Sequence, residues 1–402
     1  MNDDFSERHL LRDILKRVSR SFYLTMAVLP DGVSKQVGLA YLFARAADSI
    51  ADTGQVDRSA RVLCLRQLKS QFLLDYLNWD EIVGVQTMMA PLQSSPGERA
   101  LLEQLENCFR LFHSLEYQDQ HEIRQLLPTL ISGMEMDLTV FPGESEERVT
   151  ALPTMADLDM YIYRVAGCVG VFWTNVMCTR LPRMRRRWDP ESKGAIGIRF
   201  GKGLQLTNIL KDLPKDLRRG RCYIPQSVLE EVGLQPQDLL DKRNISKFGP
   251  VLQKLVGIAL AHLDQGWFYT LSIPRMEVRL RLACMWPILI ALRSLHLLTT
   301  SKNVLDPAET LKISRLEVYR IMLITTLTGG SGYPGILLEC SMKSSWTRWH
   351  SMGVRQVYSL ESTAPSIRRS NHHFWVGGML CNFCSLSASV CGNFPRSTPS
   401  RS

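Results

Sequence analysis

Successive segments with helical periodicity fill the chain from its start to residue 328, and strand-type alternation is nearly absent. In residues 9–20, for example, apolar side chains from Leu10 to Val18 recur at the spacing of one helix face. We expect helices over residues 9–20, 37–51, 60–77, 96–117, 121–137, 153–180, 193–217, 250–271, 276–299 and 314–326. No repeat period and no linker rich in proline, glycine or serine interrupts them. The pattern predicts one all-α domain, a single helical bundle around a central cavity.

The composition changes abruptly at Gly329. The segment 329–402 contains fifteen serines, four of the ten cysteines and no aspartate. The glycine-rich residues 329–334 stop a helix, and no sustained periodicity follows them. Cys381, Cys384 and Cys391 are of a metal-binding type, but their spacing matches no standard zinc module. We therefore expect a helical domain over residues 1–328 and a poorly ordered tail over residues 329–402.

The formal net charge of +9 is unevenly distributed. Residues 329–402 hold seven Lys or Arg and two acids, so they contribute +5 of it. A basic chain can bind nucleic acid, but the nearly balanced segment 1–328 shows no basic recognition helix with interleaved aromatics. We expect no nucleic-acid partner. The acidic N-terminus and the scattered cysteines predict a cytoplasmic protein, and no apolar run is long enough to predict a spanning helix.

Two pairs of aspartates stand out, Asp48 with Asp52 and Asp212 with Asp216. The spacing of four residues places both carboxylates of a pair on one helix face, where they repel each other. A bridging cation removes that repulsion, and hard oxygen ligands suit Mg²⁺. Asn208 extends the second row by one more turn. One such pair is more often a solvated helix face, but two pairs among apolar residues indicate a cavity lined by opposing carboxylates.

Basic residues accompany these acids. Arg45 lies three residues before Asp48, and the second motif is surrounded by Lys211, Lys215, Arg218, Arg219 and Arg221. Acids for a metal and guanidinium groups for oxyanions together describe a diphosphate site. For Arg218 and Arg219 we favour a solvated loop. Pro214 should end or kink its helix, which would leave Asp216 on an irregular turn.

Five motifs, in this order, resemble the squalene/phytoene synthase family of head-to-head prenyl condensing enzymes. They are Ser19-Arg20-Ser21-Phe22, Tyr41 with Arg45-Ala-Ala-Asp48-Ser-Ile-Ala-Asp52, Gly133-Met-Glu-Met-Asp137, the segment from Asp159 to Gly170, and Gln205-Leu-Thr-Asn208-Ile-Leu-Lys-Asp212 continuing to Pro225. The resemblance covers about residues 7–328 and implies the all-α class I terpenoid synthase fold. It also implies that residues 329–402 are not catalytic.

The resemblance further implies roles for individual residues. A Mg²⁺ cluster would be held by Asp48, Asp52, Asn208, Asp212 and Asp216. The substrate diphosphates would be bound by Ser19, Arg20, Arg45, Gln205 and Arg221. Tyr161 matches a tyrosine that assists ionisation or proton removal in the family. The cavity wall would include Phe22, Tyr41, Val165, Val169 and Leu204. An apolar, dry pocket is what a carbocation needs, since water would quench it.

The chain is most similar to a bacterial squalene synthase. Such an enzyme condenses two farnesyl diphosphates through a cyclopropylcarbinyl diphosphate and uses NADPH. The first motif has one acid at each end, Asp48 and Asp52, and the segment 281–292 resembles a late helix of squalene synthases; both favour this interpretation. Residues 220–225, by contrast, resemble the corresponding sequence of bacterial carotenoid enzymes. The alternatives are phytoene or dehydrosqualene synthase without reduction and, more remotely, a non-enzymatic assembly factor. The absence of a G-x-G-x-x-G motif predicts no Rossmann domain.

Long prenyl substrates also suggest where such an enzyme works. We expect peripheral, reversible contact of a cytoplasmic protein with the inner membrane, because both substrate and product are lipids. The oligomeric state and the role of residues 329–402 stay open.

Overall fold

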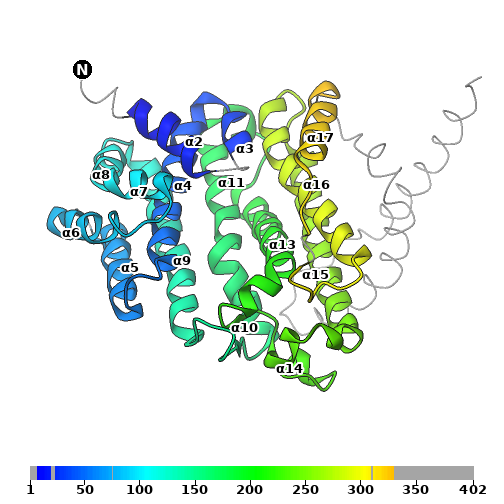
Figure 1. The fold of residues 1–402 in the computed structure, drawn as a ribbon. Helices are drawn as coiled ribbons and strands as arrows, with labels where there is room; N and C mark the ends of the chain where they lie inside the picture. Colours follow the sequence, from blue (N-terminus) through cyan, green and yellow to red (C-terminus); the bar gives the residue numbers. More distant parts are fainter. Residues whose placement is uncertain (1–6, 20–22, 75, 309–310, 330–402) are drawn as a thin grey trace, which may run out of the picture. The chain divides into compact units, whose positions relative to one another are not determined.

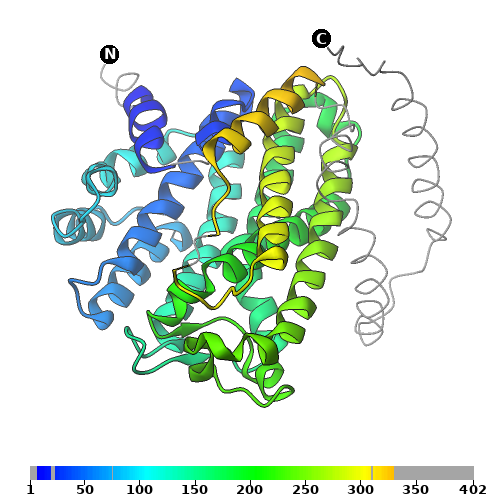
Figure 2. The ribbon, with the colours of Figure 1, turned by 45° about the vertical axis from the view of Figure 1, so that its right-hand side comes forward.

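Long helices that run beside one another form the body of the protein (Figures 1 and 2). The computed structural model describes residues 7–19, 23–74, 76–308 and 311–329, which all belong to one unit. The long helices are α4 (Asp31–Asp52), α5 (Arg58–Leu73), α9 (Tyr117–Val140), α11 (Cys168–Arg180), α13 (Pro190–Leu217), α15 (Ile245–Ser272), α16 (Val278–Thr300) and α17 (Arg315–Leu327). The expected all-α architecture is confirmed. The expected tail lies outside the described residues, apart from Gly329.

Shorter elements connect and cover these helices. They are η1 (His9–Ile14), α2 (Leu15–Val18), α3 (Tyr23–Ala27), α6 (Trp79–Met89), α7 (Pro96–Glu103), α8 (Leu105–His113), α10 (Met155–Ile162), η3 (Tyr163–Gly167), α12 (Pro182–Arg185), α14 (Gln226–Glu230), η4 (Pro236–Leu240) and η5 (Lys242–Asn244). Two residues each of β1 (Thr150–Ala151) and β2 (Arg221–Cys222) pair in parallel, with Thr150 opposite Arg221. Periodicity could not show this pair, because two residues make no alternation.

Helix α13 lies at the centre and packs against α11 on one side and α15 on the other. Its contact with α11 depends on glycine. A Cβ atom added at Gly170 would lie 2.1 Å from the backbone carbon of Gly197, so only glycine lets the two backbones approach this closely. The small residues Ala166, Gly167 and Gly170 therefore let α13 approach closely.

The buried side chains form two clusters. The first fills the N-terminal half of the bundle around Phe43, Phe72, Phe109 and Phe112, whose rings contact one another and are at most 2% exposed. The second lies around α10, α13, α15 and the second half of α16. Phe200 packs against both clusters. Aromatic packing of this kind fixes the position of α4, which carries the first aspartate pair.

Several helix boundaries differ from those expected. Residues 96–117 form two helices, α7 and α8, rather than one, and α6 was not expected. Residues 155–180 are helical but contain the π-helical turn η3, where side chains are displaced relative to a regular α-helix. Pro214 does not end α13, which remains helical to Leu217. The buried Leu210, Leu213 and Leu217 on the same helix hold this last turn in place by packing.

Helix α16 is, in the described part of the chain, the one helix long and apolar enough to cross a membrane. Its most apolar window has a mean hydropathy of 1.6, but 67% of that window is buried inside the protein. A core helix of a globular domain passes the same test.

His262 on α15 lies against α13. Nε of Arg199 donates a 3.4 Å hydrogen bond to Nδ1 of His262. Burial, followed by the charges of Arg199 and Lys202, lowers the pKa of His262 to about 4, against a smaller opposing effect of Asp159. This histidine is therefore neutral in the folded protein at pH values where it is already protonated in the unfolded chain.

We expect acid to destabilise the wild-type protein partly through this histidine. As pH falls from 6.5 towards 4, the unfolded chain binds a proton that the folded protein does not, which lowers the free energy of unfolding by about 3 kcal/mol at most. His262→Gln should flatten the dependence over this range in urea unfolding at several pH values. His121→Gln, at an exposed position on α9, should leave it unchanged. Equal slopes for wild type and His262→Gln would contradict this account.

Candidate active site

The ends of three helices meet beside the short strand β2. Asp52 is the last residue of α4, Asp137 lies one turn before the end of α9, and Asp216 is in the last turn of α13. Arg221 is the first residue of β2. It is held there by pairing with β1 and by Gly220, which has a φ of 75° and would clash with the Ser145 and Arg148 carbonyls if it carried a Cβ atom.

Arg221 is the basic centre of this group. Its Nη1 lies 4.0 Å from Oδ1 of Asp52 and 3.8 Å from Oδ2 of Asp137. Burial opposes its charge, but Tyr223 and the neighbouring carboxylates raise the pKa of Arg221 above its usual value. Arg219, although exposed, also approaches Asp52, with 3.9 Å between Nη1 and Oδ2. The half-buried guanidinium group of Arg221 is therefore permanently charged and surrounded by acids.

Two tyrosines hold Asp137. The Tyr223 hydroxyl donates a 2.9 Å hydrogen bond to Oδ1, and the Tyr161 hydroxyl donates a 3.2 Å hydrogen bond to Oδ2. The two rings stack with their centroids 4.8 Å apart. Burial raises the pKa of Asp137 to about 6 despite the opposing effects of Arg221 and both hydroxyls. Burial and Asp137 also raise the pKa of Tyr161, which therefore stays a neutral phenol.

The second acidic row lies along the end of α13. Burial and the charge of Asp212 raise the pKa of Asp216 to about 7, against the opposing effect of Arg221. Lys211 lies 3.5 Å from Oδ2 of Asp212 and donates a 3.0 Å hydrogen bond to Oδ1 of Asn208. Asp216 is thus the inner, crowded carboxylate of the row, while Asn208 is exposed.

Beside the first aspartate pair, Asp48 and Asp52, lies an arginine that already has ion-pair partners. Arg45 forms hydrogen-bonded ion pairs with both Asp48 and Glu98 of α7. Burial opposes the charge of Arg45, but these two carboxylates raise its pKa. Glu98 was not expected at the site, since 53 residues separate it from Arg45 in sequence. In this arrangement a diphosphate would have to compete with two carboxylates for the Arg45 guanidinium group.

The other expected residues are placed as follows. Ser19, which directly follows α2, is 2% exposed, and its hydroxyl donates a hydrogen bond to the Leu15 carbonyl. Tyr41 donates a 3.4 Å hydrogen bond to the Val18 carbonyl. Gln205 is half-buried on α13. Arg20 and Phe22 lie outside the described residues.

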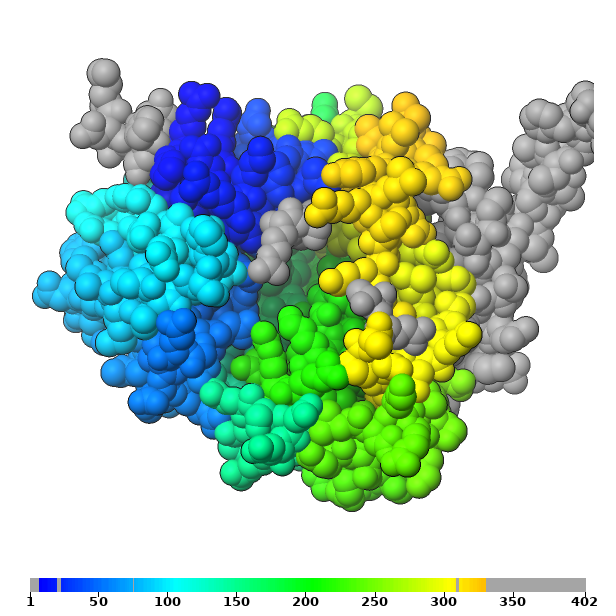
Figure 3. All heavy atoms as spheres, viewed as in Figure 1, coloured from blue at the N-terminus to red at the C-terminus, as the bar shows by residue number. Residues whose placement is uncertain are grey.

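The expected wall residues are half-buried and belong to both halves of the core. Tyr41 and Val169 pack against the first cluster, and Val165 and Leu204 pack against the second. Figure 3 shows the surface hollowed between the blue N-terminal part and the yellow C-terminal part, with green atoms of the middle of the chain deep inside. The four residues thus have the partial exposure expected of a cavity wall.

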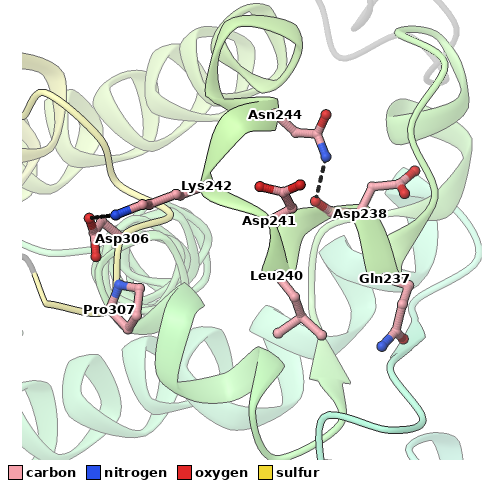
Figure 4. A pocket seen from close by; sticks show the side chains of 8 residues that line it. All are labelled: Gln237, Asp238, Leu240, Asp241, Lys242, Asn244, Asp306 and Pro307. Carbon is pink, nitrogen blue, oxygen red and sulfur yellow. Dashed lines mark hydrogen bonds and ion pairs between the residues drawn. The ribbon is translucent and has the colours of Figure 1, made fainter.

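A separate pocket of about 630 Å³ lies at η4 and η5 (Figure 4). Its lining is polar. The Lys242 ammonium group lies 2.9 Å from Oδ2 of Asp306, and Asn244 donates a hydrogen bond to the Asp238 carbonyl. None of the expected site residues lines it, so we do not assign the reaction to it.

The donors at the ends of α4 and α13 fit Mg²⁺. No three His, Cys, Asp or Glu side chains within the described ranges converge closely enough to hold a metal by themselves. Mg²⁺ does not require such a cage, because it keeps several waters and takes one or two carboxylates plus substrate phosphate oxygens. The side chains of Asp48, Asp52 and Asp212 are 43%, 48% and 48% exposed, so their oxygens can accept further partners.

Sequence reasoning assigned no role to three residues of this site. Asp137 and Tyr223 lie inside the quoted motifs, and their polar side chains among apolar neighbours were an available signal. Their contact was not available, because 86 residues separate them. Nothing in the sequence around Glu98 indicated that it belongs to the site.

The known proteins to which this chain is similar come from one family. The squalene/phytoene synthase family model matches residues 15–317. The bifunctional lycopene cyclase/phytoene synthase of Pyrenophora tritici-repentis is 29% identical over 70% of this chain and 43% of its own length. The 15-cis-phytoene synthase of Synechocystis sp. is 24% identical, over 70% of this chain and 72% of that protein. Squalene synthase of Saccharomyces cerevisiae is 26% identical, over 73% of this chain and 62% of its own length. The chain thus spans less than two thirds of the first and third relatives.

A solved structure shows the same fold. The squalene synthase TcSQS, in complex with the ligand BPH1237, superimposes with a TM-score of 0.66 at 22% identity and covers 89% of this chain and 99% of its own. The expected class I terpenoid synthase fold is therefore confirmed. The chain belongs to the squalene/phytoene synthase family, the prenyltransferases that condense prenyl diphosphates head to head.

Proposed function

We propose that this protein condenses two molecules of farnesyl diphosphate head to head to squalene, with Mg²⁺ and NADPH. The observation that carries the proposal is the convergence of Asp52, Asp137 and Asp216 on Arg221, beside Tyr161. Three carboxylates around one guanidinium group, with Asp212 beside Asp216, make a site for a polyanion only if further cations enter with it. That requirement matches a magnesium diphosphate rather than a free anion.

Different residues of the site have different roles in the ionisation of an allylic diphosphate. Asp48, Asp52, Asn208, Asp212 and Asp216 would hold Mg²⁺, which supplies Lewis-acid stabilisation of the departing diphosphate. Arg221 adds a fixed positive charge aimed at the same region. Arg45 would join it after exchanging Asp48 or Glu98 for a phosphate oxygen. We infer that Ser19, Arg20 and Gln205 complete this polar end.

The half-buried wall suits the hydrocarbon end of the reaction. Val165, Val169 and Leu204 exclude water from a carbocation, and the face of Tyr41 can attract it; Phe22 is proposed for the same role. Tyr161 keeps its proton and donates it in a hydrogen bond to Asp137. We infer that this pair accepts a proton, through the phenol oxygen and onto the carboxylate, when the cyclopropane closes.

The choice of squalene depends on the features already given, the single acids at 48 and 52 and the segment 281–292. In this reaction one diphosphate and one proton leave as the cyclopropylcarbinyl diphosphate forms. The second diphosphate then leaves, and NADPH would supply the hydride that neutralises the remaining carbocation. Without a hydride the carbocation loses a proton instead, which gives dehydrosqualene from C15 units and phytoene from C20 units.

Product analysis tests the proposal. The purified full chain is incubated with Mg²⁺ and either farnesyl or geranylgeranyl diphosphate, each with and without NADPH, and hexane extracts are analysed by mass spectrometry. We expect squalene from the C15 substrate only when NADPH is present. Phytoene from the C20 substrate would replace the proposed function by the phytoene alternative. No turnover of either substrate would favour the assembly-factor alternative.

A further inference from the structure

Helix α17 carries an exposed apolar stripe. Leu316 and Leu327 are 79% and 77% exposed, and Tyr319 and Leu323 are more than half exposed. These residues follow one another at intervals of three and four, so they share one face of the helix. The opposite face packs on α16, where Nε1 of Trp286 donates a 2.9 Å hydrogen bond to Thr325. Both faces of α17 are therefore apolar, and among the residues that the structure describes only one of them is covered.

The charges on α17 are basic on the exposed side. Arg315 and Arg320 are exposed and flank the stripe. The helix has a single acid, Glu317, and it is paired with Arg293 of α16 on the covered side, 2.5 Å away. The exposed surface of α17 thus combines apolar side chains with positive charge and presents no negative charge of its own.

The neighbouring turn between α15 and α16 has the same character. Met276 is 75% exposed, and the adjacent Arg275 is exposed as well. Because Thr325 lies against Trp286, the C-terminal end of α17 points towards this turn, and Figures 1 and 2 show both at the same end of the bundle. The acid of the turn, Glu277, is paired with Arg183 of α12 at 3.1 Å.

We propose that this surface, the exposed stripe of α17 with Arg315, Arg320 and the Met276 turn, docks on a membrane that contains anionic lipids. An amphipathic helix with apolar and basic residues on its free face is typical of binding in the plane of a lipid interface. Leucine side chains enter the acyl boundary while arginines contact headgroup phosphates. Contiguous exposed apolar surface on an otherwise globular protein also marks an interaction site.

The positive charge of this surface favours a lipid membrane as its partner over a second copy of the chain or the segment 329–402. A second copy would place arginine against arginine across a two-fold axis. Residues 329–402 carry seven Lys or Arg and two acids, so they have the same sign as the surface. An anionic headgroup layer is complementary to it. The inference does not depend on the product that the enzyme makes.

Vesicle flotation with the full chain tests the docking surface. We expect the wild type to float with phosphatidylcholine vesicles that contain phosphatidylglycerol, and to float less at high salt. The double variant Leu323→Gln/Leu327→Gln should lower the partition coefficient by about tenfold or more. Arg315→Gln/Arg320→Gln should lower it by about tenfold and reduce its salt dependence. The control Leu63→Gln/Leu73→Gln, at exposed leucines of α5, should bind as the wild type does.

Three results would overturn the proposal. One is wild-type protein that does not float, and another is a stripe variant that binds as well as the control at unchanged thermal stability. The third is a wild-type dimer in sedimentation experiments without lipid that becomes a monomer in Leu323→Gln/Leu327→Gln, since this would make the surface an interface between copies. Turnover in detergent, which needs no vesicle, separates failure here from failure of the proposed reaction.

Discussion

Asp52→Asn and Asp216→Asn, each alone, are expected to lower kcat/KM for farnesyl diphosphate by about a thousandfold or more. Each substitution keeps the shape of the side chain but removes one negative charge from the group around Arg221. The loss corresponds to several kcal/mol of stabilisation of the departing diphosphate, since a factor of ten in rate is about 1.4 kcal/mol. Release of inorganic diphosphate under steady-state conditions measures the effect.

The matched control is Asp31→Asn at the opposite end of the same helix, where the side chain is fully exposed. It should retain wild-type activity. Asp216→Asn should not lower thermal stability, because burial and Asp212 already raise the pKa of Asp216 to about 7. Removing that charge relieves repulsion. Activity retained in both site variants, or lost equally in the control, would contradict the assignment.

Gly170→Ala is expected to lower the free energy of unfolding by about 3 kcal/mol. The new methyl group would meet the backbone of Gly197 at 2.1 Å, and a backbone atom cannot rotate away as a flexible side chain can. Helices α11 and α13 would have to separate, which loosens the wall that carries Val169 and Leu204. Urea unfolding followed by circular dichroism measures the change.

Gly84→Ala serves as the comparison, because a methyl group there meets nothing within 4 Å. Gly84 is inside α6, so alanine should raise the free energy of unfolding by about 0.5–1 kcal/mol. Two glycine-to-alanine substitutions in helices are thus expected to act in opposite directions. An equal, small effect at both positions would show that the close contact between α11 and α13 is not required.

The helices were predictable because their apolar spacing is a local property of the sequence. The same holds for the aspartate rows, since a spacing of four residues fixes a shared helix face wherever the helix lies. Pro214 shows the limit of this reasoning. Its local preference is to end a helix, but Leu210, Leu213 and Leu217 are buried on one face of α13, and their packing keeps it helical.

The composition of the site was less predictable because it depends on contacts between distant residues. Arg221 meets Asp52 and Asp137 only because β2 pairs with β1 and Gly220 adopts a left-handed conformation. Two-residue strands leave no periodic signal. Glu98 reaches Arg45 from another helix, and nothing in the spacing of either residue indicates the other. Motif resemblance supplied Arg221 and Tyr161, and the structure added the carboxylate that joins them.

The most direct test of this account is the binding of a diphosphate to the group around Arg221. Isothermal titration of the full chain with farnesyl thiodiphosphate, in the presence and absence of Mg²⁺, measures it for the wild type and for Arg221→Gln. Arg218→Gln is the control, because Arg218 is exposed in the same segment and its Nε lies 3.9 Å from Oε2 of Glu146. We predict binding that requires Mg²⁺, is weakened about tenfold to a hundredfold in Arg221→Gln, and is unchanged in Arg218→Gln. Arg221→Gln binding with wild-type affinity would contradict the account.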